Sequence, residues 1–204
     1  MNQEKLKIVA YSDYICPFCY IGYHRIESLR EKYNLDIEWR PFEIHPETPK
    51  TGIRLEDFPF PKGYMEMVMA NVQRLADEDG LKLNFSGKMP NSRLALSIAE
   101  YMRDKGKLDE FHKLVLNAYW IEGKDIGDQS FLLDLAETLG FDREEIKSYI
   151  QSDEPINRFK QALSDLRACG INGVPTFIIG DRIVVGAQPI AILEKVINKA
   201  KDDN

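Results

Sequence analysis

The sequence predicts an α/β protein in which one long all-helical segment interrupts a chain of strands and helices. Three observations carry this prediction. Near the N-terminus, a strand pattern, a helix pattern and a second strand pattern follow one another. Near the C-terminus, two short strand patterns precede a helix pattern. Between these regions, apolar residues recur three and four positions apart, which is the spacing of an amphipathic helix.

The N-terminal region has the element order of a βαβ unit. We expect a strand over Leu6–Tyr11, a helix over Cys16–Tyr33 and a second strand over Ile37–Phe42, with Asn34 in the turn between the last two. Because parallel strands need a crossover connection, this order predicts a parallel pair covered by the helix.

The C-terminal region reads as a hairpin followed by a helix. Strands are expected over Thr176–Gly180 and Ile183–Val185, and Gly180 with Asp181 suits the turn between them. A helix should begin at Pro189, because proline is tolerated at a helix N-terminus. The residues that give this helix one apolar face are Ile192, Leu193, Val196 and Ile197.

The central region is predicted to be an inserted helical domain over residues 61–157. The remaining parts, residues 1–60 and 158–204, would then form one discontinuous domain. The proline-rich stretch Pro46–Pro61 is expected to connect the two, and the helix Ile156–Ala168 to lead back. Asp142 with Glu145 resembles a capping box that opens a short helix.

Composition narrows the classes of function. The chain has 204 residues, 44% of them hydrophobic, and a formal charge of −6, so it is long enough to bury a globular core. A net negative charge without long Lys/Arg runs argues against a nucleic-acid partner. No membrane partner is expected either, since no apolar stretch is long enough for a span or a signal-peptide core, and we expect a cytoplasmic protein.

Two cysteines form the first chemical motif. Cys16 and Cys19 enclose Pro17 and Phe18 directly after the first strand and at the start of the helix pattern. A thiolate at a helix N-terminus is stabilised by unpaired backbone N–H groups and by the positive end of the helix dipole. Cys16 is therefore the expected nucleophile. Cys19 lies one turn later, where it could close a disulfide with Cys16.

The second motif lies far along the chain. Gly173-Val174-Pro175-Thr176-Phe177 places a proline at the start of a strand rich in β-branched and aromatic residues. Proline cannot donate to a sheet ladder and is normally tolerated only at strand starts or edges. A C-x-x-C pair alone could also be half of a zinc site. Its combination with this proline is a far more specific indication of a redox dithiol than either motif alone.

Together these motifs resemble the DsbA-like branch of the thioredoxin superfamily, and specifically its FrnE-like members. The resemblance covers nearly the whole chain and rests on three segments, namely Asp13-Tyr14-Ile15-Cys16-Pro17-Phe18-Cys19-Tyr20-Ile21-Gly22, Gly170-Ile171-Asn172-Gly173-Val174-Pro175-Thr176-Phe177 and Gly186-Ala187-Gln188. The segment Asn91-Ser92-Arg93-Leu94-Ala95 is also similar to these relatives. The resemblance implies a thioredoxin fold with an inserted all-helical domain.

The resemblance also implies roles for individual residues. Cys16 would attack, Cys19 would resolve, and Pro175 would follow a cis peptide bond and shape the substrate groove. The further residues expected to contact substrate are Pro17, Phe18 and Val174. Many thioredoxin-like proteins carry a buried carboxylate six residues before the first cysteine, but this chain has Ala10 there, and Asp13 is the nearest acid.

The implied activity is that of a cytosolic thiol–disulfide oxidoreductase or isomerase. Its substrates would be disulfides or dithiols of proteins or small molecules, and its only cofactor the Cys16–Cys19 pair, with glutathione as a candidate reductant. Kappa-class glutathione transferases and 2-hydroxychromene-2-carboxylate isomerases share this fold and similar central motifs, so a glutathione-dependent isomerase or transferase is the alternative. Those relatives typically have serine where this chain has Cys16. A peptide-binding module without redox chemistry is a third reading, and the sequence assigns no oligomeric state.

Cys169 and the histidines have simpler interpretations. Cys169 continues the helical stripe Phe159, Leu163 and Leu166, so its thiol is expected in the core, with a regulatory thiol as the alternative. A zinc site of Cys16, Cys19, Cys169 and a histidine would need support from a second ligand pair. The sequence holds neither a second C-x-x-C nor an H-x-x-x-H, so no metal site is expected.

Overall fold

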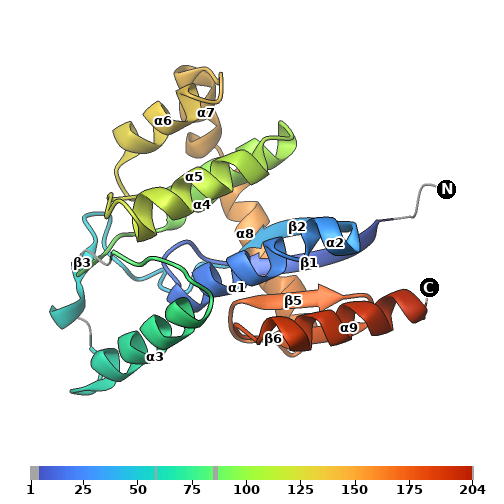
Figure 1. Cartoon of the computed structure of the whole chain (residues 1–204). Coiled ribbons are helices and arrows are strands. Elements are labelled where there is room, and N and C mark those ends of the chain that lie inside the picture. The colour runs from blue at the N-terminus through green and yellow to red at the C-terminus, as the bar shows by residue number, and fades with distance from the viewer. Residues whose placement is uncertain (1–4, 58, 85–86, 204) are drawn as a thin grey trace. The chain divides into compact units, whose positions relative to one another are not determined.

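The described chain divides into two compact units. A computed structural model describes residues 5–57, 59–84 and 87–203. The first unit joins Met1–Ile44 to Ala162–Asn204, and the second is His45–Gln161. Figure 1 shows the helices and strands of each unit along the chain.

The first unit is built on a four-stranded mixed sheet. Its elements are β1 (Leu6–Ser12), α1 (Pro17–Glu27), α2 (Arg30–Tyr33), β2 (Leu35–Pro41), the end of α8 (Glu154–Ala168), β5 (Thr176–Ile179), β6 (Arg182–Val185) and α9 (Ile190–Asp202). The strand order is β2-β1-β5-β6, with β1 and β2 parallel and the other pairs antiparallel. The predicted βαβ and hairpin–helix patterns are therefore confirmed, and they join through β1 and β5.

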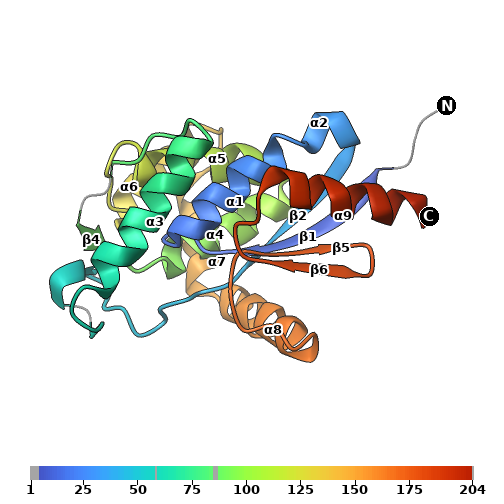
Figure 2. The same cartoon turned by 60° about the horizontal axis from the view of Figure 1, so that its bottom comes forward.

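Both faces of this sheet are covered. Ala10 of β1 and its partner Phe177 of β5 are fully buried on the face that α1 and α9 cover. On the other face, Tyr11 packs with Ala162 and Leu166 of α8. Figure 2 shows β5 and β6 between α8 and α9. The end of β1, from which the chain continues into α1, is therefore packed on both faces of the sheet.

The helix expected over Cys16–Tyr33 is interrupted. α1 ends at Glu27, and a separate short turn, α2, begins at Arg30. The hydroxyl of Ser28 donates a hydrogen bond of 2.7 Å to the carbonyl of Arg25, which competes with helix continuation. Asn34 then ends α2 in the left-handed conformation, with φ of 49°.

The second unit is mainly helical but is not all-helical as predicted. Its elements are β3 (Ile53–Arg54), a 3-10 turn (Leu55–Asp57), α3 (Tyr64–Glu78), β4 (Lys88–Met89), α4 (Arg93–Asp104), α5 (Leu108–Trp120), α6 (Gln129–Glu137), α7 (Arg143–Gln151) and the start of α8. β3 and β4 form a short antiparallel pair. The carboxylate of Asp142 caps α7 by accepting 2.9 Å hydrogen bonds from the backbone N–H groups of Glu144 and Glu145, as the sequence predicted.

The boundaries of the insertion differ from those read in the sequence. The stretch predicted as a connector, Pro46–Pro61, belongs to the second unit. Two contacts explain this: Ile53 pairs with Met89, and the side-chain amide of Asn91 donates a 2.6 Å hydrogen bond to the Thr48 carbonyl. The other boundary falls within α8, at Gln161 instead of residue 157. Within the described part of the chain, no helix is long and apolar enough to cross a membrane.

Candidate active site

Cys16 lies where β1 has ended and α1 begins. Its backbone is extended, with φ of −81° and ψ of 116°, and it is the N-cap residue of α1, with Pro17 as the first helical residue. The Cys16 carbonyl accepts the first helical hydrogen bond, from the Tyr20 N–H at 3.1 Å. No acidic residue occupies the first turn. The sulfur is therefore next to the positive end of the helix.

Val174 and Pro175 lie beside this sulfur although they are far away in sequence. The Val174–Pro175 peptide bond is cis, as the resemblance implied. The Cys16 thiol donates a long hydrogen bond of 3.9 Å to the Val174 carbonyl oxygen. The carbonyl of Pro175 accepts a 2.8 Å hydrogen bond from the Gly186 N–H, and the Thr176 hydroxyl donates one of 2.7 Å to the Gly173 carbonyl. This loop is therefore fixed on both sides of the proline.

Gly22 permits the close approach between α1 and β5. A Cβ atom at Gly22 would lie 3.0 Å from Cγ of Pro175 and 3.2 Å from Cζ of Phe177. Distances this short leave no room for a larger residue without movement of two ring systems. The sequence places this glycine two turns into the helix that Cys16 opens, so it sets the distance between the dithiol helix and the proline strand.

The two thiols of the motif are in different environments. Cys19 is 1% exposed and Cys16 is 5% exposed, and neither forms a disulfide in this structure. Burial, followed by a hydrogen bond with Cys16, raises the pKa of Cys19 well above its ordinary value. Cys19 therefore holds its proton at neutral pH. Pro17, Phe18 and Val174, which were expected to contact substrate, are all half-buried around this site.

Comparison with known proteins gives the family. Residues 7–198 match the DSBA-like thioredoxin domain. The chain belongs to this family. It is 32% identical over 194 residues to the uncharacterised protein YwbO of Bacillus subtilis, and the alignment covers 94% of this chain and 95% of that protein. It is also 24% identical over 193 residues to a 2-hydroxychromene-2-carboxylate isomerase of Sphingobium xenophagum, covering 92% and 95% of the two chains.

A solved structure agrees with the fold. The structure of the cytosolic disulfide reductase DsbM of Pseudomonas aeruginosa with GSH superimposes with a TM-score of 0.69 at 18% identity, and the alignment covers 95% of this chain and 100% of that chain. The fold is therefore the DsbA-like thioredoxin fold expected from the sequence. The family includes oxidoreductases and isomerases.

Asp13 has a structural role that sequence reasoning left open. This DsbA-family chain carries Ala10 at the position of the usual buried acid, and Ala10 faces Phe177 in the sheet. Asp13 is fully buried, and its carboxylate accepts hydrogen bonds from the backbone N–H groups of Ile15 at 3.3 Å and Ile44 at 2.9 Å. The Asp13 carbonyl also accepts from the Cys16 N–H at 3.2 Å. Asp13 thus ties the loop before the dithiol to the chain that follows β2.

Cys169 is exposed, so the prediction that it is buried is wrong. α8 ends at Ala168, and Gly170 turns the chain with φ of 70°, so the apolar stripe stops at Leu166 and no longer fixes the direction of the next thiol. Among the described residues, no three His, Cys, Asp or Glu side chains come together in a way that could hold a metal ion. His24 packs instead against the rings of Tyr20 and Tyr23.

Proposed function

We propose that this protein is a thiol–disulfide oxidoreductase that exchanges disulfides through Cys16 and Cys19. One observation carries the proposal: the Cys16 sulfur lies at the N-terminus of α1 and 3.9 Å from the carbonyl oxygen of Val174. A nucleophile is thereby placed beside backbone that precedes strand β5 and could pair with an extended substrate. Pro17, Phe18 and Val174 would contact that substrate, and Pro175 would shape the groove.

The exchange has two steps. The Cys16 thiolate attacks one sulfur of the substrate disulfide, so that a Cys16–substrate disulfide forms and the other substrate sulfur leaves as a thiolate that takes up a proton. Cys19 then loses its proton and attacks the Cys16 sulfur, which releases the second substrate thiol. The substrate gains two electrons and the protein becomes a Cys16–Cys19 disulfide. The raised pKa of Cys19 favours attack first by Cys16.

The oxidised protein needs a reductant, and we propose glutathione in the cytoplasm. Two glutathione thiols would supply the two electrons and leave as glutathione disulfide, which restores both cysteine thiols. The similar fold of the cytosolic disulfide reductase DsbM, in its structure with GSH, supports this proposal. In a reducing compartment a C-x-x-C pair is more often catalytic than structural.

A second candidate is a glutathione-dependent isomerase, because one relative is a 2-hydroxychromene-2-carboxylate isomerase. That chemistry leaves the substrate at the same oxidation level, so Cys19 would have no part in turnover. Retention of Cys19 one turn after Cys16, with the two thiols hydrogen bonded, favours the dithiol reaction. The two functions therefore differ in whether turnover requires Cys19.

Insulin reduction with glutathione tests the proposal. We expect the wild type to accelerate reduction and Cys16→Ser to fall to the uncatalysed rate, because the attacking sulfur is lost. Cys169→Ser is the control and should keep the wild-type rate, since Cys169 is exposed and has no step in the exchange. Undiminished reduction by Cys16→Ser would reject the proposed nucleophile. Isomerisation of 2-hydroxychromene-2-carboxylate by a protein that does not reduce disulfides would establish the second candidate.

A further inference from the structure

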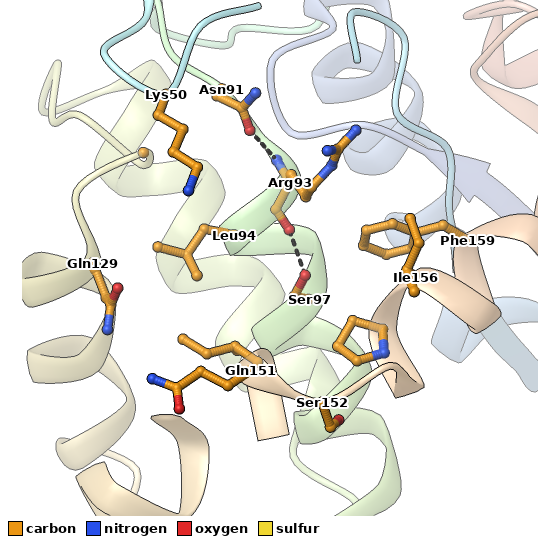
Figure 3. Close-up of a pocket in the computed structure, with 13 residues that line it drawn as sticks. Lys50, Asn91, Arg93, Leu94, Ser97, Gln129, Gln151, Ser152, Ile156 and Phe159 are labelled. Carbon is orange, nitrogen blue, oxygen red and sulfur yellow. Dashed lines mark hydrogen bonds between the residues drawn. The ribbon is translucent and has the colours of Figure 1, made fainter. Parts of the chain in front are cut away.

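The second unit contains a cavity formed entirely by its own residues. Its volume is about 410 Å³, which is within the usual range for a small-molecule site. Figure 3 shows its walls, which come from the loop that carries Lys50, the first turns of α4, the start of α6, the end of α7 and the start of α8. The dithiol is not among the lining residues, so this cavity needs a separate explanation.

The charge of the lining is unusual for this protein. The chain has 33 acidic and 27 basic residues, yet Lys50 and Arg93 line the cavity and no Asp or Glu does. Asp153 and Glu154 lie between the lining residues Ser152 and Pro155 in sequence, but both are exposed and neither lines the cavity, and Glu154 pairs with Arg158 at 2.8 Å. Two other acids close to lining residues in sequence also have partners. Asp125 pairs with Lys88 at 2.6 Å, and Asp128 caps α6 by accepting from the Ser130 N–H at 2.8 Å. The cavity therefore favours an anion over a cation.

The polar end of the cavity carries donors that can bind such an anion. In Figure 3 the Lys50 side chain extends over Leu94, and Gln129 and Gln151 lie on the same side of the cavity. Within the described parts of the chain, the Lys50 ammonium forms no ion pair. The side-chain amides of Gln129 and Gln151 likewise make no hydrogen bond to described residues. These three groups can donate to a carboxylate without breaking an existing contact.

The opposite end holds apolar side chains, and in Figure 3 the Arg93 side chain lies on the same side. Ile156 and Phe159 of α8 lie together on the far side of Leu94 in Figure 3, and Pro155 also lines the cavity. Ile156 is 38% exposed, which is high for a large apolar side chain. A ligand that covered Ile156 and Phe159 would remove apolar surface from water, which is favourable.

Two of the helices that line this cavity, α4 and α8, are fixed to each other. Arg158 of α8 donates to both carboxylate oxygens of Asp104 in α4, at 2.9 and 2.6 Å. Arg158 also donates at 3.3 Å to the carbonyl of Glu100. Within α4, the Ser97 hydroxyl donates to the Arg93 carbonyl at 2.7 Å. The α4 and α8 walls of the cavity are therefore held together before any ligand arrives, which lowers the cost of binding.

We propose that this cavity binds a small organic monoanion in which one carboxylate is joined to a compact apolar body. The carboxylate would lie at Lys50, Gln129 and Gln151, and the apolar body against Ile156 and Phe159. This site does not depend on the chemistry of the dithiol, so it can be tested separately.

The probe is 4-phenylbutyrate, with 4-phenylbutanamide as its uncharged analogue and acetate as an anion without an apolar body. Binding is followed in the full-length protein by backbone amide chemical shifts in ¹H–¹⁵N spectra. We expect 4-phenylbutyrate to give saturable shifts at residues 93–97 and 150–156. The amide should bind about tenfold more weakly, because it lacks the charge that Lys50 pairs with, and acetate should not saturate.

Variants of Lys50 give the decisive comparison. Lys50→Gln should weaken 4-phenylbutyrate binding about tenfold and leave binding of 4-phenylbutanamide unchanged. Lys50→Arg keeps the positive charge, so it should bind 4-phenylbutyrate as the wild type does. Lys124→Gln is the matched control, because Lys124 is an exposed lysine of the same unit that does not line the cavity. Equal affinity of Lys50→Gln and wild type for 4-phenylbutyrate would overturn the proposal. Absence of saturable shifts at the lining residues, or equal binding of acetate, would overturn it as well.

Discussion

At the scale of single residues, Asp13 positions the reactive loop through three hydrogen bonds to backbone N–H groups. Its buried carboxylate holds the backbone N–H groups of Ile15 and Ile44, and its carbonyl holds that of Cys16. A carboxylate offers acceptors to both N–H groups at once, whereas an amide offers one acceptor atom and one donor. The Asp13 side chain therefore has a structural role in the loop that precedes the dithiol.

Asp13→Asn should lower the free energy of unfolding by about 1–3 kcal/mol, because one buried N–H group then loses its acceptor. Urea unfolding of the reduced protein measures this change. Asp36→Asn serves as the control, since Asp36 is exposed on β2 and should change stability by less than about 0.5 kcal/mol. Equal effects of the two substitutions would mean that the Asp13 carboxylate contributes no more than a surface acid.

Cys19 gives the reduced protein a dependence on alkaline pH. Its pKa is raised in the folded protein, mainly by burial, so above about pH 9 the unfolded chain loses this proton while the folded chain keeps it. The unfolded state then binds fewer protons, and the free energy of unfolding falls as pH rises. Below that pH both states keep the Cys19 proton, so the contribution of this thiol to the free energy of unfolding is fully present.

We therefore expect Cys19→Ala to lose less stability than the wild type between about pH 8 and pH 10. Urea unfolding of both reduced proteins at the two pH values measures the difference. Tyr11 and Tyr20 also have a raised pKa through burial, but they are present in both proteins and cancel in the comparison. Identical losses in the two proteins would show that Cys19 ionises equally in the folded and unfolded states.

At the scale of elements, the packing of α1 on β5 brings the two halves of the site together. Gly22 is the contact point, because its missing side chain lets the helix approach Pro175 and Phe177. Alanine is favoured over glycine in helices by about 1 kcal/mol, but overpacking of a close contact costs about 1–3 kcal/mol. The second effect should prevail, because both neighbours are rings within 3.2 Å.

Gly22→Ala is thus expected to destabilise the protein by about 1 kcal/mol, and Gly22→Val by more, because its side chain is larger and branched. Thermal unfolding of the two variants beside the wild type gives the order. A gain in stability for Gly22→Ala would mean that the contact relaxes without cost and that helix propensity decides.

The elements also show what a sequence pattern can and cannot predict. The strands of the first unit follow from apolar runs and turn residues, so their positions along the chain were predictable. The end of α1 at Glu27 was not, because the apolar pattern does not report where the backbone hydrogen bonds of a helix stop. Cys169 was misplaced for a related reason: helical spacing predicts burial only while the helix continues, and α8 ends one residue earlier.

At the scale of the whole molecule, the sequence predicts a helical insertion within a thioredoxin-like domain. The boundaries of that insertion were inferred from composition alone. Proline-rich sequence suggested a connector before residue 61, whereas β3 and Asn91 join that stretch to the second unit. Contacts between residues distant in sequence decide such boundaries. The same limit applied to Asp13, whose partner Ile44 lies 31 positions away.

The most direct test of the dithiol reaction is to trap its intermediate. Cys19→Ser in a Cys169→Ser background leaves Cys16 as the sole thiol, and the background removes reaction at the exposed Cys169. After incubation with a peptide disulfide, intact-mass spectrometry followed by peptide mapping should find a peptide bound covalently to Cys16, because no thiol remains to release it. Cys169→Ser with Cys19 intact should instead return to the unmodified mass or that of the Cys16–Cys19 disulfide. Absence of the Cys16 adduct in the Cys19→Ser protein would contradict the proposed exchange.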